Sequence, residues 1–223
     1  MSLLSEQDQN TVRTHLAGMT HGVTLVFFTQ TIGGPESDLM ARQVVDELAS
    51  LSDRITVDEV NLVLDKKRAA ALGVDAAPTV VVLRDGKDTR IRFLGAPAGY
   101  EFMSLVEAVA LAGGDDSGLT AESKALIAEH ATTPIEIQVF VTPTCPHCPR
   151  AVLLAYRMAF ENANIRATCV EATEFIALSQ KYNVTGVPKT VVNDTVEIMG
   201  AVPEDEFVRA AVLRNEPDTR TSP

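Results

Sequence analysis

The chain has 223 residues, of which 46% are hydrophobic and 22% charged, and its formal net charge is −11. This length predicts one or two domains with hydrophobic cores. The negative charge argues against nucleic acids and anionic membranes as partners, because both bind basic surfaces. No apolar run is long enough to span a bilayer, and the first residues do not resemble a secretory signal. We therefore expect a cytoplasmic protein.

The first half of the chain predicts alternating helices and strands. Residues 23–29 are nearly all apolar, as in a strand buried on both faces, and 37–51 have apolar residues at helical spacing. The predicted elements, in order, are a helix at 5–17, a strand at 23–29, a helix at 37–51, a strand at 55–62, a short helix at 65–72, strands at 79–83 and 89–94 around a turn at 85–86, and a helix at 98–111.

The second half predicts the same order of elements. They are a helix at 121–130, a strand at 136–142, a long helix from about Pro146 to 162, a strand at 165–170, a helix at 173–182, strands at 190–192 and 195–199 around a turn, and a helix at 203–214. The glycine- and aspartate-rich residues 113–119 are typical of a linker, and 215–223 of a flexible tail.

An internal repeat supports this division. Val74 and Pro78 have counterparts in Val184 and Pro188 at an offset of 110 residues. Strands connected through helices are parallel with right-handed crossovers, and the last two strands of each half form a hairpin. The sequence therefore predicts an α/β fold of two tandem units, each a central mixed four-stranded sheet flanked by helices. Unit one is 1–112 and unit two is 120–214.

Two of the three cysteines lie where a buried strand gives way to the long helix of unit two. Cys145 and Cys148 are separated by Pro146 and His147. A helix start favours a thiolate, and an adjacent histidine can add positive charge. Proline suits the first helical position. This pattern indicates disulfide exchange, with Cys145 as the attacking thiolate and Cys148, one turn further in, as the resolving thiol.

Pro188 is the second part of the predicted site. A proline that opens a central strand cannot donate to the ladder, so Val187–Pro188 is a candidate cis peptide bond. The Val187 backbone would then lie opposite Cys145 and pair with an extended substrate. We take Thr144, Val187 and Pro188 as candidate substrate-binding residues.

The strand, the Cys-x-x-Cys, the helix and the later proline resemble the thioredoxin superfamily. Two such units in tandem resemble the glutaredoxin-like protein disulfide oxidoreductases, and the run from Val141 to Pro149 resembles their second active site. The resemblance implies a redox-active Cys145–Cys148 disulfide, no bound cofactor, and protein or peptide disulfides and dithiols as substrates. It implies that electrons come from a reductase or glutathione. The buried aspartate usual in thioredoxins is replaced here by Val139.

Unit one departs from that family because residues 1–144 contain no cysteine. A cysteine-free first unit before an active second unit resembles the N-terminal portion of the flavoprotein component of alkyl hydroperoxide reductase. That resemblance implies an alternative function, an electron carrier between a thioredoxin-reductase-like flavoprotein and a peroxiredoxin.

A third interpretation is an iron–sulfur or metal-binding module. Zinc sites need four ligands, and only Cys169 and scattered histidines accompany the cysteine pair, so we name no metal ligand. Cys169 lies in an apolar strand and is expected to be a buried, inert thiol.

Overall fold

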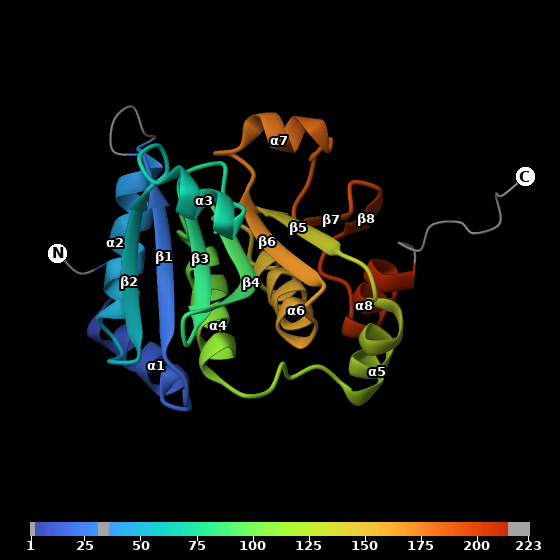
Figure 1. Ribbon diagram of the computed structural model, residues 1–223, viewed down its shortest axis with the longest axis horizontal. Coiled ribbons are helices and arrows are strands. Elements are labelled where there is room, and N and C mark those ends of the chain that lie inside the picture. Colours follow the sequence, from blue (N-terminus) through green and yellow to red (C-terminus); the bar gives the residue numbers. More distant parts are fainter. Residues whose placement is uncertain (1–2, 31–35, 214–223) are drawn as a thin grey trace, which may run out of the picture.

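The structure, a computed structural model, describes residues 3–30 and 36–213. Its eight strands form one mixed sheet in the order β2-β1-β3-β4-β6-β5-β7-β8 (Figure 1). The strands are β1 (Val23–Thr29), β2 (Ile55–Asn61), β3 (Thr79–Arg84), β4 (Lys87–Leu94), β5 (Ile135–Val141), β6 (Ile165–Glu171), β7 (Lys189–Val192) and β8 (Val196–Met199). Each predicted four-stranded set is present, and the repeat of the two units is confirmed.

The helices follow the predicted order. They are α1 (Glu6–Leu16), α2 (Ser37–Ala49), α3 (Lys66–Leu72), α4 (Glu101–Gly113), α5 (Ala121–His130), α6 (Cys148–Glu161), α7 (Ile176–Lys181) and α8 (Glu204–Leu213). Two helices begin later than predicted. The start of α6 at Cys148 is discussed with the site, and α7 begins at Ile176 because the preceding residues form a turn around Glu171. The predicted flexible tail, 215–223, lies outside the described residues.

The two units share one sheet, which the sequence did not predict. Strand β4 of unit one pairs in parallel with β6 of unit two, from Ile91↔Ala167 to Leu94↔Val170. Because β1, β2, β4, β5, β6 and β8 all run in the same direction, their carboxyl ends lie at one edge of the sheet. We call this edge the C-edge; it carries the corresponding end of both units.

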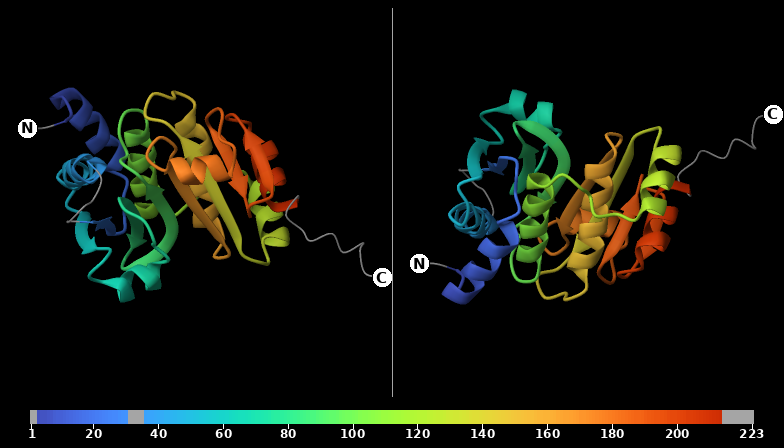
Figure 2. Two further views of the ribbon diagram at one scale, coloured as in Figure 1. Left: turned by 90° about the horizontal axis from the view of Figure 1, so that it is seen from above. Right: turned by 90° about the horizontal axis from the view of Figure 1, so that it is seen from below.

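The hydrophobic core follows the same arrangement. Helices α4 and α6 lie side by side on one face of the sheet, and α3 lies on the other (Figure 2). Beneath α4 and α6 a single buried cluster runs from unit one into unit two. On the opposite face, each unit has its own smaller cluster, one next to α3 and the other next to α7. The shared cluster gives the two units a common core.

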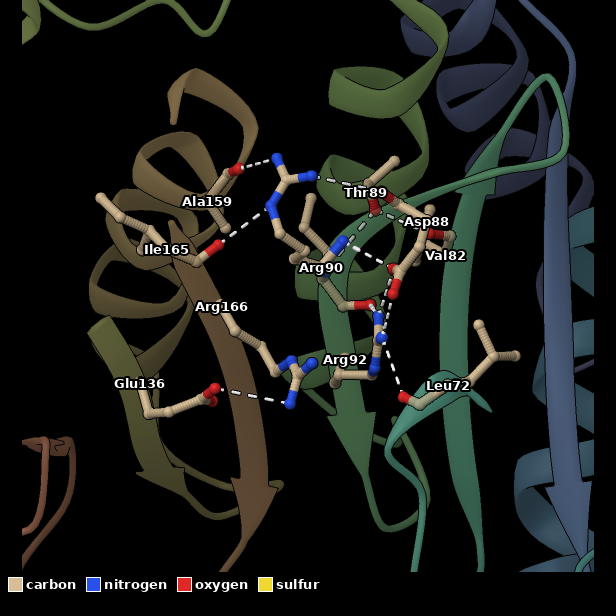
Figure 3. A network of polar contacts seen from close by, with 11 residues as sticks. Leu72, Val82, Asp88, Thr89, Arg90, Arg92, Glu136, Ala159, Ile165 and Arg166 are labelled. Carbon is tan, nitrogen blue, oxygen red and sulfur yellow. Dashed lines mark hydrogen bonds and ion pairs between the residues drawn. The ribbon is translucent and has the colours of Figure 1, made fainter. Parts of the chain in front are cut away.

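Polar contacts also join the units at the β4–β6 seam (Figure 3). The Arg90 guanidinium donates to the backbone carbonyl of Ala159 at 2.6 Å and to that of Ile165 at 3.1 Å. In the other direction, the buried Tyr156 hydroxyl donates to the carbonyl of Arg92 at 2.9 Å. Hydrogen bonds from charged donors to buried carbonyls are among the stronger ones, so these contacts hold the units in register.

A histidine ties the linker to the opposite edge of unit one. The His21 ring contacts Asp85 through Nδ1 at 2.6 Å and Asp115 through Nε2 at 2.8 Å. The hydrogen bond to Asp85 is the main cause that raises the pKa of His21, followed by the bond to Asp115. Both ring nitrogens donate only in the imidazolium form, so this contact favours protonated histidine.

None of the helices in the described part of the chain is long and apolar enough to cross a membrane.

Candidate functional site: a disulfide at the C-edge

Cys145 and Cys148 are bonded to each other, with their Cα atoms 5.5 Å apart. Strand β5 ends at Val141 and α6 begins at Cys148, so the disulfide lies in the strand-to-helix connection at the C-edge. The two cysteines differ in access. Cys145 keeps 8% of its surface exposed, whereas Cys148 is fully buried. A partner sulfur can therefore approach Cys145 more readily than Cys148.

The start of α6 differs from the prediction. Pro146 was expected at the first helical position, but it lies in the turn before the helix, and Pro149 occupies the first helical turn instead. Proline is tolerated there because the first N–H groups of a helix have no intrahelical acceptor. Cys145 is held in the preceding turn by its N–H, which donates to Thr142 at 3.1 Å. His147 caps the helix through its backbone, without a side-chain hydrogen bond.

The residues around the cysteines reach the surface. Thr144, Pro146 and His147 are all exposed, so they can contact a docked substrate. Among the contacts of the described residues, none joins the His147 side chain to a sulfur, and its role near the disulfide stays a prediction.

The Val187–Pro188 peptide bond is cis, as predicted. It directly precedes β7, which pairs antiparallel to β5 with Phe140 opposite Lys189. Pro188 therefore lies next to the end of β5 from which the disulfide connection leaves. The carbonyl of Pro188 accepts from Gly200 at 2.8 Å, while the backbone of Val187 has no hydrogen-bond partner among the described residues. Free backbone groups of this kind are available to an extended segment.

Unit one repeats this loop without the thiols. Ala77–Pro78 is also cis, and Gly95 donates to the carbonyl of Pro78 at 2.9 Å, as Gly200 does to Pro188. Unit one has therefore kept the shape of the proline loop, while the chemistry lies in unit two alone.

A buried carboxyl that sequence reasoning missed comes from unit one. Glu101, the first residue of α4, is completely buried. Its neighbour Tyr100 donates its N–H to the carbonyl of Pro143 at 2.9 Å, and Pro143 is two residues from Cys145. Helix α4 also packs against α6, which begins at Cys148. Glu101 thus lies at the interior of the junction that carries the disulfide.

The surroundings of Glu101 keep its carboxyl partly protonated near neutral pH. Oε2 accepts from Ser104 Oγ at 2.6 Å and from Cys169 Sγ at 3.7 Å, and Oε1 has no partner among the described residues. Burial raises the pKa of Glu101 to about 7; the two hydrogen bonds lower it in part, and the nearby charge of Glu171 raises it further. A carboxyl with such a pKa can take up and release protons under physiological conditions.

Cys169 is buried, as predicted, and it is free of any disulfide. Burial, together with the negative charge of Glu101, raises its pKa well above the usual value, which disfavours the thiolate. Cys169 pairs across the sheet with Val139, which occupies the position of the buried aspartate of thioredoxins. The carboxyl of Glu101 thus contacts the strand position adjacent to Val139, but it is supplied by the other unit.

Glu171 is a second buried acid at this end of the sheet, and its role is local. Its carboxylate accepts from the Thr173 hydroxyl at 2.7 Å and from the Glu174 N–H at 2.7 Å. These bonds cap the turn before α7, as expected for an acid at a helix start.

No group of three or more histidine, cysteine, aspartate or glutamate residues suited to a metal ion occurs in 3–30 and 36–213. The same ranges contain a groove of about 820 Å³ between the end of α3 and α7, above the β4–β6 seam. Its lining includes Arg92, Arg166 and Phe175 but neither cysteine of the disulfide, so the groove is separate from the redox site.

Comparisons with known proteins agree with the geometry. A thioredoxin domain family matches residues 135–213, which make up most of unit two. The crystal structure of the NTD_N/C domain of alkylhydroperoxide reductase AhpF from Enterococcus faecalis is similar, with a TM-score of 0.87 and 28% identity, covering 94% of this chain and 100% of that one. A protein disulfide oxidoreductase from Aeropyrum pernix is similar with a TM-score of 0.84 and 28% identity, covering 93% and 91%.

Among curated proteins, the alkyl hydroperoxide reductase protein AhpF of Escherichia coli is 26% identical over 193 residues, covering 86% of this chain and 34% of the relative. The chain spans about a third of the length of the curated relatives it matches. The chain is therefore a thioredoxin-fold protein of two tandem units with a Cys145–Cys148 disulfide, similar to the N-terminal domain of AhpF and to a protein disulfide oxidoreductase.

Proposed function

We propose that the protein is a thiol–disulfide oxidoreductase that exchanges disulfides with protein or peptide substrates through Cys145 and Cys148. The observation that carries the proposal is the disulfide itself, at the start of a helix, with one partly exposed and one fully buried sulfur. This asymmetry supports the assignment of Cys145 as nucleophile and Cys148 as resolving thiol.

The exchange has two steps. In the reduced protein, the Cys145 thiolate attacks one sulfur of a substrate disulfide, forms a mixed disulfide and expels the other substrate sulfur, which takes a proton. The Cys148 thiolate then attacks Cys145 Sγ, breaks the mixed disulfide and releases the second substrate thiol, which also takes a proton. The substrate gains two electrons and two protons, and the Cys145–Cys148 disulfide is formed.

Both thiols of the protein must lose their protons in this sequence, and Cys148 does so in the interior. We assign Glu101 as the proton acceptor for the dithiol, because it is buried at the same junction and its pKa of about 7 suits uptake and release. Val187, with its free backbone groups, and the exposed Thr144, Pro146 and His147 are proposed to contact the substrate.

Insulin reduction by dithiothreitol tests the proposal. We expect the wild-type protein to accelerate precipitation of the insulin B chain and Cys145→Ser to abolish the acceleration. Cys169→Ser should keep it, since that thiol is buried and unpaired with another cysteine. Full activity of Cys145→Ser would show that the nucleophile is assigned wrongly.

A second candidate function is that of a dedicated electron carrier between a thioredoxin-reductase-like flavoprotein and a peroxiredoxin. The cysteine-free unit one and the similarity to the AhpF domain favour it. It predicts rapid turnover with one protein partner and weak activity on insulin. Equal, slow rates with every disulfide would contradict it. A cytoplasmic location and supply of electrons by a reductase or glutathione stay predictions.

A further inference from the structure

The apolar surface of the protein is concentrated at the C-edge, on both units. Ten large hydrophobic side chains of the described residues are exposed, and eight of them follow or end strands at that edge or begin the helices that start there. These eight, which we call the apolar rim, are Leu39, Met40, Val63, Leu64, Tyr100, Met103, Ile176 and Met199. A soluble domain rarely gathers exposed apolar groups in this way unless they are covered by a partner.

Most of the rim belongs to unit one, which cannot exchange disulfides. Leu39 at the start of α2 is 71% exposed, and Leu64 after β2 is 84% exposed. Neither residue is part of a core in the described protein, and unit one has no thiol that they could serve. Their exposure is therefore explained neither by the folding of unit one nor by chemistry within it.

The rim is continuous with the disulfide. An apolar hollow of about 320 Å³ is lined by Met40 of α2 and by the segment Pro97, Ala98 and Gly99. The next residue, Tyr100, donates to the carbonyl of Pro143 in the connection that carries Cys145. Gly99 packs so closely on this carbonyl that a Cβ there would lie 2.3 Å from it. A partner resting on the unit-one rim would thus also rest on the edge of the redox site.

The width of the rim indicates the kind of partner. From β2, next to Leu64, to β5, before Cys145, there are five strand spacings, or about 24 Å. An extended peptide paired with Val187 covers only the unit-two end of this distance, whereas the face of a globular domain covers all of it. Any exchange requires a partner sulfur to bond with Cys145 Sγ, so the occupant of this edge is the protein that carries that sulfur.

We infer that unit one is a docking platform. Its apolar rim binds the folded thiol protein whose cysteine exchanges with Cys145, and the hollow beside Met40 takes an anchoring apolar side chain of that partner. This inference rests on the proposed function and adds the selection of folded partners over small or unfolded disulfides. It gives the cysteine-free unit a role in recognition.

The test compares one double variant with a matched control. Leu39→Asp combined with Leu64→Asp places two charges on the unit-one rim, far from the disulfide. Leu213→Asp places a charge on an exposed leucine at the end of α8, which runs from the C-edge to the opposite edge. Each reduced protein is mixed with three oxidised probes: a folded 2-Cys peroxiredoxin, insulin and the small disulfide DTNB.

We expect the double variant to lose about tenfold in its second-order rate constant with the peroxiredoxin and to stay within twofold of wild type with DTNB. Leu213→Asp should stay within twofold with both. Equal rates of the double variant and wild type with the peroxiredoxin would overturn the inference, as would an equal loss in Leu213→Asp.

Two further outcomes separate the inference from the function on which it rests. If wild type reduces insulin but shows no preference for the peroxiredoxin, the docking inference fails and the oxidoreductase proposal stands. If it reduces neither protein, both fail. Sedimentation of wild type and the double variant adds a last check: a dimer that the double variant abolishes would assign the rim to a second copy of the chain and overturn the inference.

Discussion

The buried carboxyl of Glu101 has a consequence for stability that can be measured directly. Glu101→Gln replaces it with a group of nearly the same shape that does not ionise, and the amide oxygen can still accept from Ser104. Burial raises the pKa of Glu101 from 4.5 to about 7 in the folded protein. A pKa raised by folding means that the carboxyl stabilises the fold fully below pH 4.5 and that this contribution is lost as pH rises through about 7.

The size of the effect follows from the shift. Each pKa unit corresponds to about 1.4 kcal/mol, so a rise from 4.5 to about 7 changes the free energy of unfolding by about 3 kcal/mol between the two extremes. Because Glu101 is completely buried, solvent screening does not reduce this figure greatly. The stability of the wild type relative to Glu101→Gln should therefore fall by about 3 kcal/mol between pH 4.5 and 8.5.

Urea unfolding of the oxidised proteins at pH 4.5, 5.5, 6.5, 7.5 and 8.5 measures this difference. Glu122→Gln on the exposed face of α5 is the matched control and should show a difference from wild type that does not change with pH. A difference between wild type and Glu101→Gln that is also constant over this range would refute the assignment of Glu101 as a carboxyl protonated near neutral pH.

Three further predictions concern the joints of the fold. Arg90→Ala removes two hydrogen bonds to backbone carbonyls of unit two and should lower the free energy of unfolding by about 2 kcal/mol in urea at pH 7, whereas a loss below 0.5 kcal/mol would contradict its role at the seam. His21→Asn should lose stability relative to wild type mainly at low pH, with the difference fading as pH rises through the raised pKa of His21; a pH-independent difference would speak against the charged contact. Gly99→Ala should lower the melting temperature and speed alkylation of the reduced site thiol, because its Cβ would meet the carbonyl of Pro143 and its φ is +60°; Gly18→Ala, with open space around it, should change neither.

The sequence predicted the elements and their repeat because local patterns determine them. Apolar spacing placed the helices, β-branched runs placed the strands, and the shared valines and prolines revealed the two units. The cysteine pair was recognisable because its chemistry requires a short, fixed spacing at a strand-to-helix connection. The cis bond before Pro188 followed from the difficulty of opening a central strand with proline, and it is confirmed.

What the sequence could not predict depends on contacts between the units. The pairing of β4 with β6 is set by tertiary packing and leaves no local mark. Glu101 was missed for the same reason: an acid at the start of an apolar helix usually serves the helix dipole, and only the assembled structure brings it under a disulfide of the other unit. Pro146 was misplaced because Pro149 suits the first helical turn equally well.

The most direct test of the central claim is to trap the mixed disulfide. In Cys148→Ser the resolving thiol is gone, so the reduced variant mixed with oxidised peroxiredoxin or insulin should accumulate a covalent adduct. Peptide mass spectrometry should locate the bond at Cys145, and Cys145→Ser should form no adduct. An adduct through Cys169, or equal trapping by Cys145→Ser, would contradict the account.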